Sequence, residues 1–145
     1  MNKLFTATTE ESRDVAILIL RLMLGAVMFA HGAQKVLGIF GGKGLEETVG
    51  MMSGTFGSFL PYLSAFTEFL GGIAMIFGIA TRFWGIGIMI NMLVAIFVVH
   101  LKNGFIGQGS YEYPLTLAVI ALALTITGPG RYSLDVMLHR KLQKP

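Results

Sequence analysis

The run from Val15 to Leu37, VAILILRLMLGAVMFAHGAQKVL, decides the fold of this chain. A transmembrane helix needs about 20 mainly apolar residues to cross roughly 30 Å of bilayer hydrocarbon, and this run is long enough. Three further runs are predicted to span the membrane, at residues 59–79, 83–99 and 113–127. The last two are shorter, and the fourth must borrow flanking residues to cross. Four spans with short connections predict an all-α, antiparallel four-transmembrane-helix bundle.

The composition is typical of a chain embedded in lipid. Of the 145 residues, 54% are hydrophobic and 13% are charged, whereas a soluble domain carries about 25% charged residues. No long polar stretch marks a second unit, so residues 1–145 are expected to form a single integral membrane domain. The absence of cysteine excludes disulfides, thiolate nucleophiles and Cys-ligated clusters. We assign the net charge of +3 to membrane topology, and no nucleic-acid partner is expected.

The orientation follows from the basic residues, because positively charged segments stay on the cytoplasmic side. One side of the predicted bundle carries most of them: Lys3, Arg13, Arg82, Arg131, Arg140, Lys141 and Lys144. The other side carries Lys35, Lys43 and Lys102. Both termini are therefore expected to be cytoplasmic, and the loops at 38–58 and 100–112 are expected to face outward.

Two short helices are expected outside the spans. In the loop at 38–58, apolar residues recur at helical spacing, which predicts a short outward-facing amphipathic segment. These residues are Leu45, Val49, Met52 and Phe56. After Gly128-Pro129-Gly130 ends the fourth span, Ser133 and Asp135 form an N-cap pattern that predicts a cytoplasmic C-terminal helix. Glycines inside the spans are expected to let the helices pack closely, among them Gly25, Gly32, Gly72 and Gly85.

Several polar side chains lie inside the predicted spans, where each charge costs at least about 2.5–3.5 kcal/mol on insertion scales. They are Arg21, His31, Lys35, Glu68 and Asn91, with His100 at the end of the third span and Glu112 at the head of the fourth. At about 1.5 Å per residue, Glu68 lies at the depth of Met28, within one turn of His31. Glu68 and His31 are therefore the predicted catalytic pair. Some of these polar residues also have explanations that involve no function. In these alternatives Arg21 reaches the cytoplasmic surface along its own stem, and interfacial solvation explains Lys35, His100 and Glu112.

These residue types suit a quinone or phenol head group. A glutamate near a histidine can hold and pass one proton, and a nearby cation can stabilise an anionic oxygen. Such a ligand enters from the membrane by its apolar tail and needs hydrogen-bond partners for its head. The predicted partners are Lys35, Asn91, Glu112, Arg21 and His100. The alternative cofactor is haem, ligated by His31 and His100 from two helices, and no metal-ion site is predicted.

Several motifs, in order, resemble the DoxX family. They are GAVMFAHGAQK at 25–35, EFLGG at 68–72, TR at 81–82, NMLVA at 91–95, NGF at 103–105, YEYP at 111–114, GPG at 128–130 and SLD at 133–135. The resemblance implies a small four-helix protein of the prokaryotic cytoplasmic membrane. Roles in the family are tied to quinone-linked thiosulfate oxidation, to quinone or catechol resistance and to a membrane oxidoreductase complex.

The resemblance also marks a set of polar positions. The family's recurring polar residues correspond to His31, Lys35, Glu68, Arg82, Asn91, Glu112 and Asp135. Five of these belong to the polar set already described. The predicted topology puts the other two, Arg82 and Asp135, together on the cytoplasmic face, where we expect them to form a structural clasp.

The leading functional hypothesis is a quinone- or quinol-interacting subunit of a membrane oxidoreductase complex. The chain supplies no electron carrier of its own, so net electron transfer needs a bound quinone, a haem or a partner subunit. Two alternatives stay open, a carrier or exporter of a small amphipathic solute and a non-catalytic assembly or scaffold subunit. The expected partners are the lipid bilayer, a quinone-like small molecule and an oxidoreductase partner subunit, and a homo-oligomer is left open.

Overall fold

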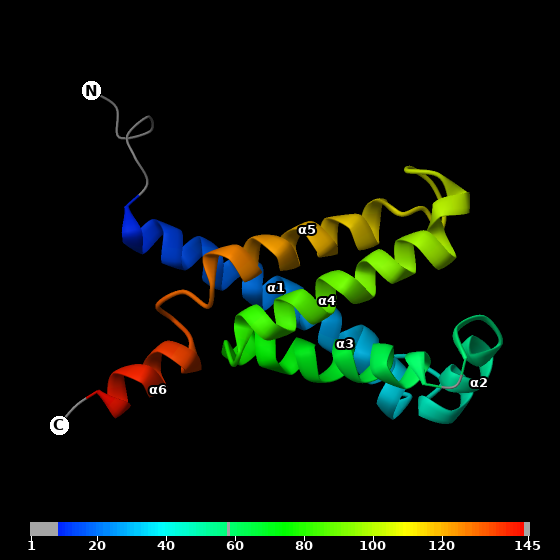
Figure 1. Cartoon of the computed structure of the whole chain (residues 1–145), viewed down its shortest axis with the longest axis horizontal. Coiled ribbons are helices and arrows are strands. Elements are labelled where there is room, and N and C mark those ends of the chain that lie inside the picture. Colours follow the sequence, from blue (N-terminus) through cyan, green and yellow to red (C-terminus); the bar gives the residue numbers. More distant parts are fainter. Residues whose placement is uncertain (1–8, 58, 144–145) are drawn as a thin grey trace.

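Every regular element in the described part of the chain is a helix (Figure 1). The computed structural model describes residues 9–57 and 59–143. Its long helices are α1 (Glu10–Leu37), α3 (Leu60–Phe77), α4 (Thr81–Ala95) and α5 (Glu112–Thr127). The helix α4 continues into a π-helix, η2 (Ile96–His100), and a 3₁₀-helix, η3 (Leu101–Asn103), and the short helices are α2 (Leu45–Phe56) and α6 (Leu134–Leu142). The predicted all-α class is confirmed.

Three of the helical segments described are long and apolar enough to cross a membrane: Glu10–Leu37, Leu60–Phe77 and Thr81–Asn103. They correspond to the predicted spans at 15–37, 59–79 and 83–99. The fourth predicted span, at 113–127, forms α5, which is apolar and has 16 residues. At 1.5 Å per residue α5 is about 24 Å long, shorter than the roughly 30 Å of bilayer hydrocarbon.

Local sequence signals set the ends of these helices. The Thr9 hydroxyl caps α1 by accepting a hydrogen bond from the Ser12 N–H at 3.2 Å, which satisfies one of the free donors of the first turn. Gly38 follows the last residue of α1 and Gly78 follows the last residue of α3, and both glycines are in the left-handed region with φ near 70°. Glycine takes this conformation without a steric penalty, so both helices end where the sequence allows a sharp turn.

The long helices approach one another through glycines, as predicted. A Cβ added to Gly32 of α1 would overlap the backbone of Phe69, and one added to Gly72 of α3 would overlap the backbone of Phe29. On the other side of the bundle, a Cβ on Gly85 of α4 would overlap the Thr125 hydroxyl of α5. Small residues thus set two close pairs, α1 with α3 and α4 with α5.

The four long helices alternate in direction between two ends of the molecule (Figure 1). One end, here called the α6 end, holds the first turn of α1, the α3–α4 turn, the connector between α5 and α6, and α6 itself. The other, the α2 end, holds α2 and the loop at 104–111. Fully buried apolar side chains fill the bundle between the ends, including Leu24, Met28, Met75, Ile88 and Leu124.

Both short helices form where the sequence predicted them. The amphipathic segment is α2, in which Val49 is buried, while the side chain of Phe56 lies outside the described set. The Ser133 hydroxyl caps α6 by accepting a hydrogen bond from the Val136 N–H at 3.3 Å. The basic residues Lys3 and Lys144, counted in the topology prediction, lie outside the described residues.

Candidate functional site

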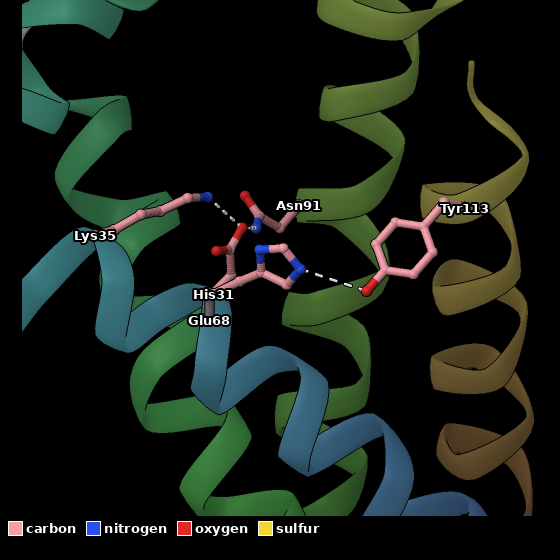
Figure 2. Close-up of polar contacts among 5 residues, drawn as sticks. All are labelled: His31, Lys35, Glu68, Asn91 and Tyr113. Carbon is pink, nitrogen blue, oxygen red and sulfur yellow. Dashed lines mark hydrogen bonds and ion pairs between the residues drawn. The ribbon is translucent and has the colours of Figure 1, made fainter. Parts of the chain in front are cut away.

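Glu68 is the buried centre of a polar cluster in the middle of α3 (Figure 2). Its residue surface is 4% exposed. Lys35 of α1 donates to Glu68 Oε1 from Nζ at 2.6 Å, forming an ion pair, and Asn91 of α4 donates to the same oxygen from Nδ2 at 2.9 Å. Side chains from three helices, α1, α3 and α4, therefore meet at one carboxylate.

The other carboxylate oxygen, Glu68 Oε2, is buried and has no hydrogen-bond partner within the described residues. Leaving a buried acceptor unsatisfied costs roughly 1–3 kcal/mol, and such groups are rare in native proteins. Because both protein donors converge on Oε1, Oε2 keeps its full capacity to accept. A ligand that carries an O–H or N–H donor would satisfy it.

A groove of about 560 Å³ runs between α3 and α4 beside this cluster. Lys35, Glu68 and Asn91 supply polar groups to its lining, and the remaining lining is largely apolar. Four wall residues are 40–52% exposed on the outer surface of α3 and α4: Leu63, Phe66, Ile90 and Val94. The groove therefore opens sideways, toward the hydrocarbon, and its volume lies in the range of small-molecule sites.

At the α2 end the groove reaches the π-helix η2. Val99 and His100 line it there, and the π-helical turn replaces the regular α-helical spacing over Ile96–His100. Turns of this kind occur frequently at functional sites. His100 Nδ1 lies 2.7 Å from the Gly109 carbonyl oxygen, so His100 joins the groove to the loop at 104–111 and does not bond to Glu68.

The predicted Glu68–His31 pair does not form. His31 Nε2 instead lies 3.4 Å from the Tyr113 hydroxyl of α5, and Figure 2 shows this contact separate from the one at Glu68. His31 and Lys35 are one turn apart on α1, and the longer Lys35 side chain is the one that reaches Glu68. The depth count placed His31 at the right level, but the direction in which it points from α1 takes it to α5.

Arg21 also lies outside the groove, contrary to its predicted place in the head-group pocket. Its guanidinium donates to the backbone carbonyls of Pro129 and Tyr132 in the α5–α6 connector. The residue is only 1% exposed, so it does not reach water along its stem either. Arg21 is too near the α6 end to contact Glu68, and it anchors the connector against α1.

Glu112 is the second predicted pocket residue that the groove does not include. It lies in the first turn of α5 and is exposed, and it is absent from the groove lining. An acidic residue in this position interacts favourably with the positive end of the helix dipole. This local role accounts for Glu112 without a ligand.

The predicted Arg82–Asp135 clasp is formed by different partners. The Asp135 carboxylate accepts hydrogen bonds from the N–H groups of Ala80 at 3.0 Å and Thr81 at 3.3 Å. The two ion pairs in the described residues are Lys35–Glu68 and Lys43–Glu47, so Arg82 is not paired with Asp135. Asp135 does join α6 to α4, but it does so by accepting from N–H groups at the start of α4 that have no partner within the helix.

Two residues at the site were not predicted, Tyr113 and Trp84. Tyr113 is the partner of His31, and a tyrosine hydroxyl within a predicted span is a signal that could have found it. Trp84 is the single tryptophan of the chain and lines the groove. No sequence signal distinguishes a groove-lining aromatic residue from one that packs against lipid.

The fold and the site together define an α-helical membrane protein with a buried carboxylate beside a groove open to lipid. The DoxX family model matches residues 16–101. The chain belongs to the DoxX family. The resemblance carried by the sequence motifs is thereby confirmed.

Three relatives are similar to this chain over most of their length. "Putative oxidoreductase CatD" of Bacillus subtilis is 35% identical over 115 residues, which cover 79% of this chain and 82% of the relative. "Inner membrane protein YqjF" of Escherichia coli is 32% identical over 130 residues, 88% of this chain and 95% of the relative. An uncharacterized membrane protein of Mycobacterium tuberculosis is 27% identical over 138 residues, 87% and 83% of the two chains. No solved structure matches this chain.

Proposed function

We propose that this protein binds the head group of a quinone or quinol at Glu68 and serves as a quinone-interacting subunit of a membrane oxidoreductase complex. One observation carries the proposal. Glu68 Oε2 is a buried, unpartnered acceptor at an apolar groove that opens toward lipid. A quinol has the two features that match this arrangement, a hydroxyl donor on its ring and an apolar tail.

The residues of the cluster have distinct tasks in this proposal. Lys35 and Asn91 fix the carboxylate through Oε1, which leaves Oε2 to accept the hydrogen bond of a ligand hydroxyl. The apolar walls formed by α3 and α4 hold the tail. When bound, the quinone–quinol couple supplies two-electron, two-proton redox chemistry, and Glu68 is the group placed to hold a proton that the hydroxyl gives up.

The electrons need a route outside this chain. The sequence has no cysteine and so no thiol or Cys-ligated cluster. We therefore assign electron transfer to a partner subunit. The printed name of the Bacillus subtilis relative, which calls that protein a putative oxidoreductase, supports this class of reaction.

The proposal includes a topology with four spans and both termini in the cytoplasm. In it α5 is the fourth span and crosses with the help of flanking residues. Arg13, Arg82, Arg131 and Arg140 then lie at the α6 end, on the cytoplasmic side. The name of the Escherichia coli relative, an inner membrane protein, supports the cytoplasmic membrane of a prokaryote as the location.

The test uses Trp84 as an internal reporter, because it is the only tryptophan and lines the groove. The full chain in lipid nanodiscs is titrated with a decyl-tailed benzoquinol and the matching benzoquinone, and binding is followed by Trp84 fluorescence. Replacing Glu68→Gln removes the charge and replaces one of the two accepting oxygens by a donating NH2 group. A hydrogen bond to a charged group is worth about 1.5–3 kcal/mol, so we expect quinol affinity to fall by about tenfold or more.

Glu112→Gln is the matched control, because it makes the same change in a carboxylate outside the groove. It should leave the titration unchanged. Equal quinol affinity in the wild type and in Glu68→Gln, with both proteins folded, would contradict the proposal. An oxidised-minus-reduced absorption spectrum of the purified protein separates the haem alternative, since a Soret band would point to His31 and His100 as ligands.

A second candidate is a carrier for a small amphipathic solute, and the extent of the groove favours it. The lining runs along α3 and α4 from Leu60 and Val99 near the α2 end to Phe83 and Trp84 near the α6 end. A solute could follow this lining from one end to the other. Uptake of a labelled phenol into proteoliposomes, lost in Glu68→Gln, would favour the carrier over the oxidoreductase subunit.

A further inference from the structure

A second pocket, of about 390 Å³, lies at the α6 end and is lined by three arginines. Arg13 comes from the first turns of α1, Arg131 from the α5–α6 connector and Arg140 from α6. Figure 1 shows these three segments gathered at one end of the bundle. This arginine pocket is separate from the groove beside Glu68, with which it shares no lining residue.

Several hydrogen bonds fix the connector that brings the arginines together. The buried Arg21 guanidinium holds the carbonyls of Pro129 and Tyr132. The Asp14 carboxylate of α1 accepts from the Arg131 N–H at 3.2 Å, and the Ser133 hydroxyl donates to the Gly130 carbonyl at 2.8 Å. The position of Arg131 beside α1 is therefore built into the fold.

The charge of the pocket is strongly positive. Its lining holds three arginines and one carboxylate, Asp14, which leaves a net charge of +2. Asp14 is engaged with a backbone N–H, and the two ion pairs in the described residues involve neither it nor the arginines. The guanidinium groups of Arg13, Arg131 and Arg140 are on exposed residues and can bind an anionic group.

The surroundings of the pocket fit a lipid better than a free anion. Ile17 and Val136 add apolar surface to its lining. Arg13 precedes the apolar run that begins at Val15, so it lies where a membrane-spanning helix passes from headgroups into hydrocarbon. Ile126 on α5 and Met137 on α6 are next in the sequence to the lining residues Thr127 and Val136. They are 68% and 62% exposed, which gives acyl chains an apolar surface to lie on.

We propose that the arginine pocket binds the headgroup phosphate of an anionic phospholipid, with its acyl chains against the turns of α1 and α5 nearest the α6 end. Basic pockets at the ends of membrane helices bind anionic headgroups in this way. The lipid would hold α6 and the connector against the bundle. This site stands independently of the quinone proposal, since neither its residues nor its ligand take part in the groove.

The test measures phospholipid binding to the full chain in detergent by native mass spectrometry. Phosphatidylglycerol and phosphatidylcholine with identical acyl chains are compared in the wild type and in the triple variant Arg13→Gln, Arg131→Gln and Arg140→Gln. We expect the wild type to prefer phosphatidylglycerol. Each arginine removed should weaken that binding about fivefold, as expected for a basic residue near an anionic headgroup. The corresponding triple lysine variant, which keeps the charge, should retain the preference.

A second triple variant, Lys43→Gln, Lys102→Gln and Lys141→Gln, is the matched control. It removes the same total charge from residues outside the pocket and should bind like the wild type. Equal loss in both glutamine variants would overturn the proposal in favour of general charge attraction. Equal binding of the two lipids would also overturn it, as would displacement of phosphatidylglycerol by an equal concentration of glycerol phosphate, which would indicate a small-anion site.

Discussion

Glu68 receives both of its hydrogen bonds on one oxygen, and this asymmetry supports the proposed binding site over a purely structural ion pair. A carboxylate that only fixed the helix register would gain from a partner on each oxygen. Here Lys35 and Asn91 both reach Oε1, and Oε2 remains buried without one. The same two donors orient the carboxylate, so the accepting oxygen is presented in a fixed position.

The sequence predicted part of this cluster. A carboxylate within an apolar span indicates an inward-facing, functional residue, and Asn91 was among the residues predicted to line the same pocket. It did not predict that Lys35 rather than His31 reaches Glu68, because depth along a helix is read from residue number while direction depends on helix rotation and side-chain length. His31 and Lys35 lie one turn apart on α1, yet His31 contacts Tyr113 of α5 and Lys35 contacts Glu68 of α3.

Replacing the buried Arg21 should lower stability without removing the groove. Arg21→Met deletes two hydrogen bonds and leaves the Pro129 and Tyr132 carbonyls without the guanidinium. The free energy of unfolding should fall by about 2–3 kcal/mol, because two backbone carbonyls lose a charged donor. The measurement is a detergent-denaturation curve followed by circular dichroism.

Lys141→Met is the control for Arg21, since it changes a cation to methionine at an exposed position of α6. An exposed substitution of this kind should alter the unfolding free energy by less than about 0.5 kcal/mol. If Arg21→Met were as stable as Lys141→Met, the claim that Arg21 stabilises the α5–α6 connector would be contradicted.

Among the helices, the pairing of α1 with α3 depends on three glycines that leave no room for a side chain, Gly25, Gly32 and Gly72. Gly72→Ala places a Cβ in the backbone of Phe29, and overpacking of this kind typically costs about 1–3 kcal/mol. We expect Gly72→Ala to lower the free energy of unfolding by that amount. The same denaturation curves measure it.

Gly87→Ala provides the matched comparison on α4. A Cβ there meets the Thr67 methyl at 3.6 Å, an ordinary contact, and alanine is favoured over glycine in a helix by up to about 1 kcal/mol. This variant should therefore be at least as stable as the wild type. Equal destabilisation by both substitutions would show that the close approach at Gly72 does not govern the α1–α3 pair.

The ends of the helices were less predictable than their existence. The third predicted span began at residue 83, whereas α4 begins at Thr81 because Asp135, more than fifty residues later in the chain, caps its first N–H groups. A contact that is distant in the sequence therefore decides where α4 begins. The predicted span at 83–99 covered most of the π-helix η2, but the π-helical spacing was not predicted, since no local signal marks a change of helical spacing.

For the whole molecule, hydropathy predicted the all-α class and three helices long and apolar enough to cross a membrane, because lipid requires each crossing segment to satisfy its own backbone hydrogen bonds. The all-α class and the short helices α2 and α6 follow from the sequence. The groove between α3 and α4 does not, because it depends on how far apart two apolar helices lie. The sequence predicted the polar residues of its lining, Lys35, Glu68 and Asn91. The position of the groove between these two helices is seen only in the structure.

The central claim is that a quinone head group lies at Glu68 with its tail between α3 and α4. Photolabelling tests this most directly, using a tail-linked azidobenzoquinone with the full chain in nanodiscs, followed by mass spectrometry of the labelled peptides. The account predicts labels on groove-wall residues such as Leu63, Phe66, Ile90 and Val94, suppressed by excess unlabelled quinol. Labels spread equally over exposed residues outside the groove, such as Ile19 and Val119, and insensitive to the competitor would contradict it.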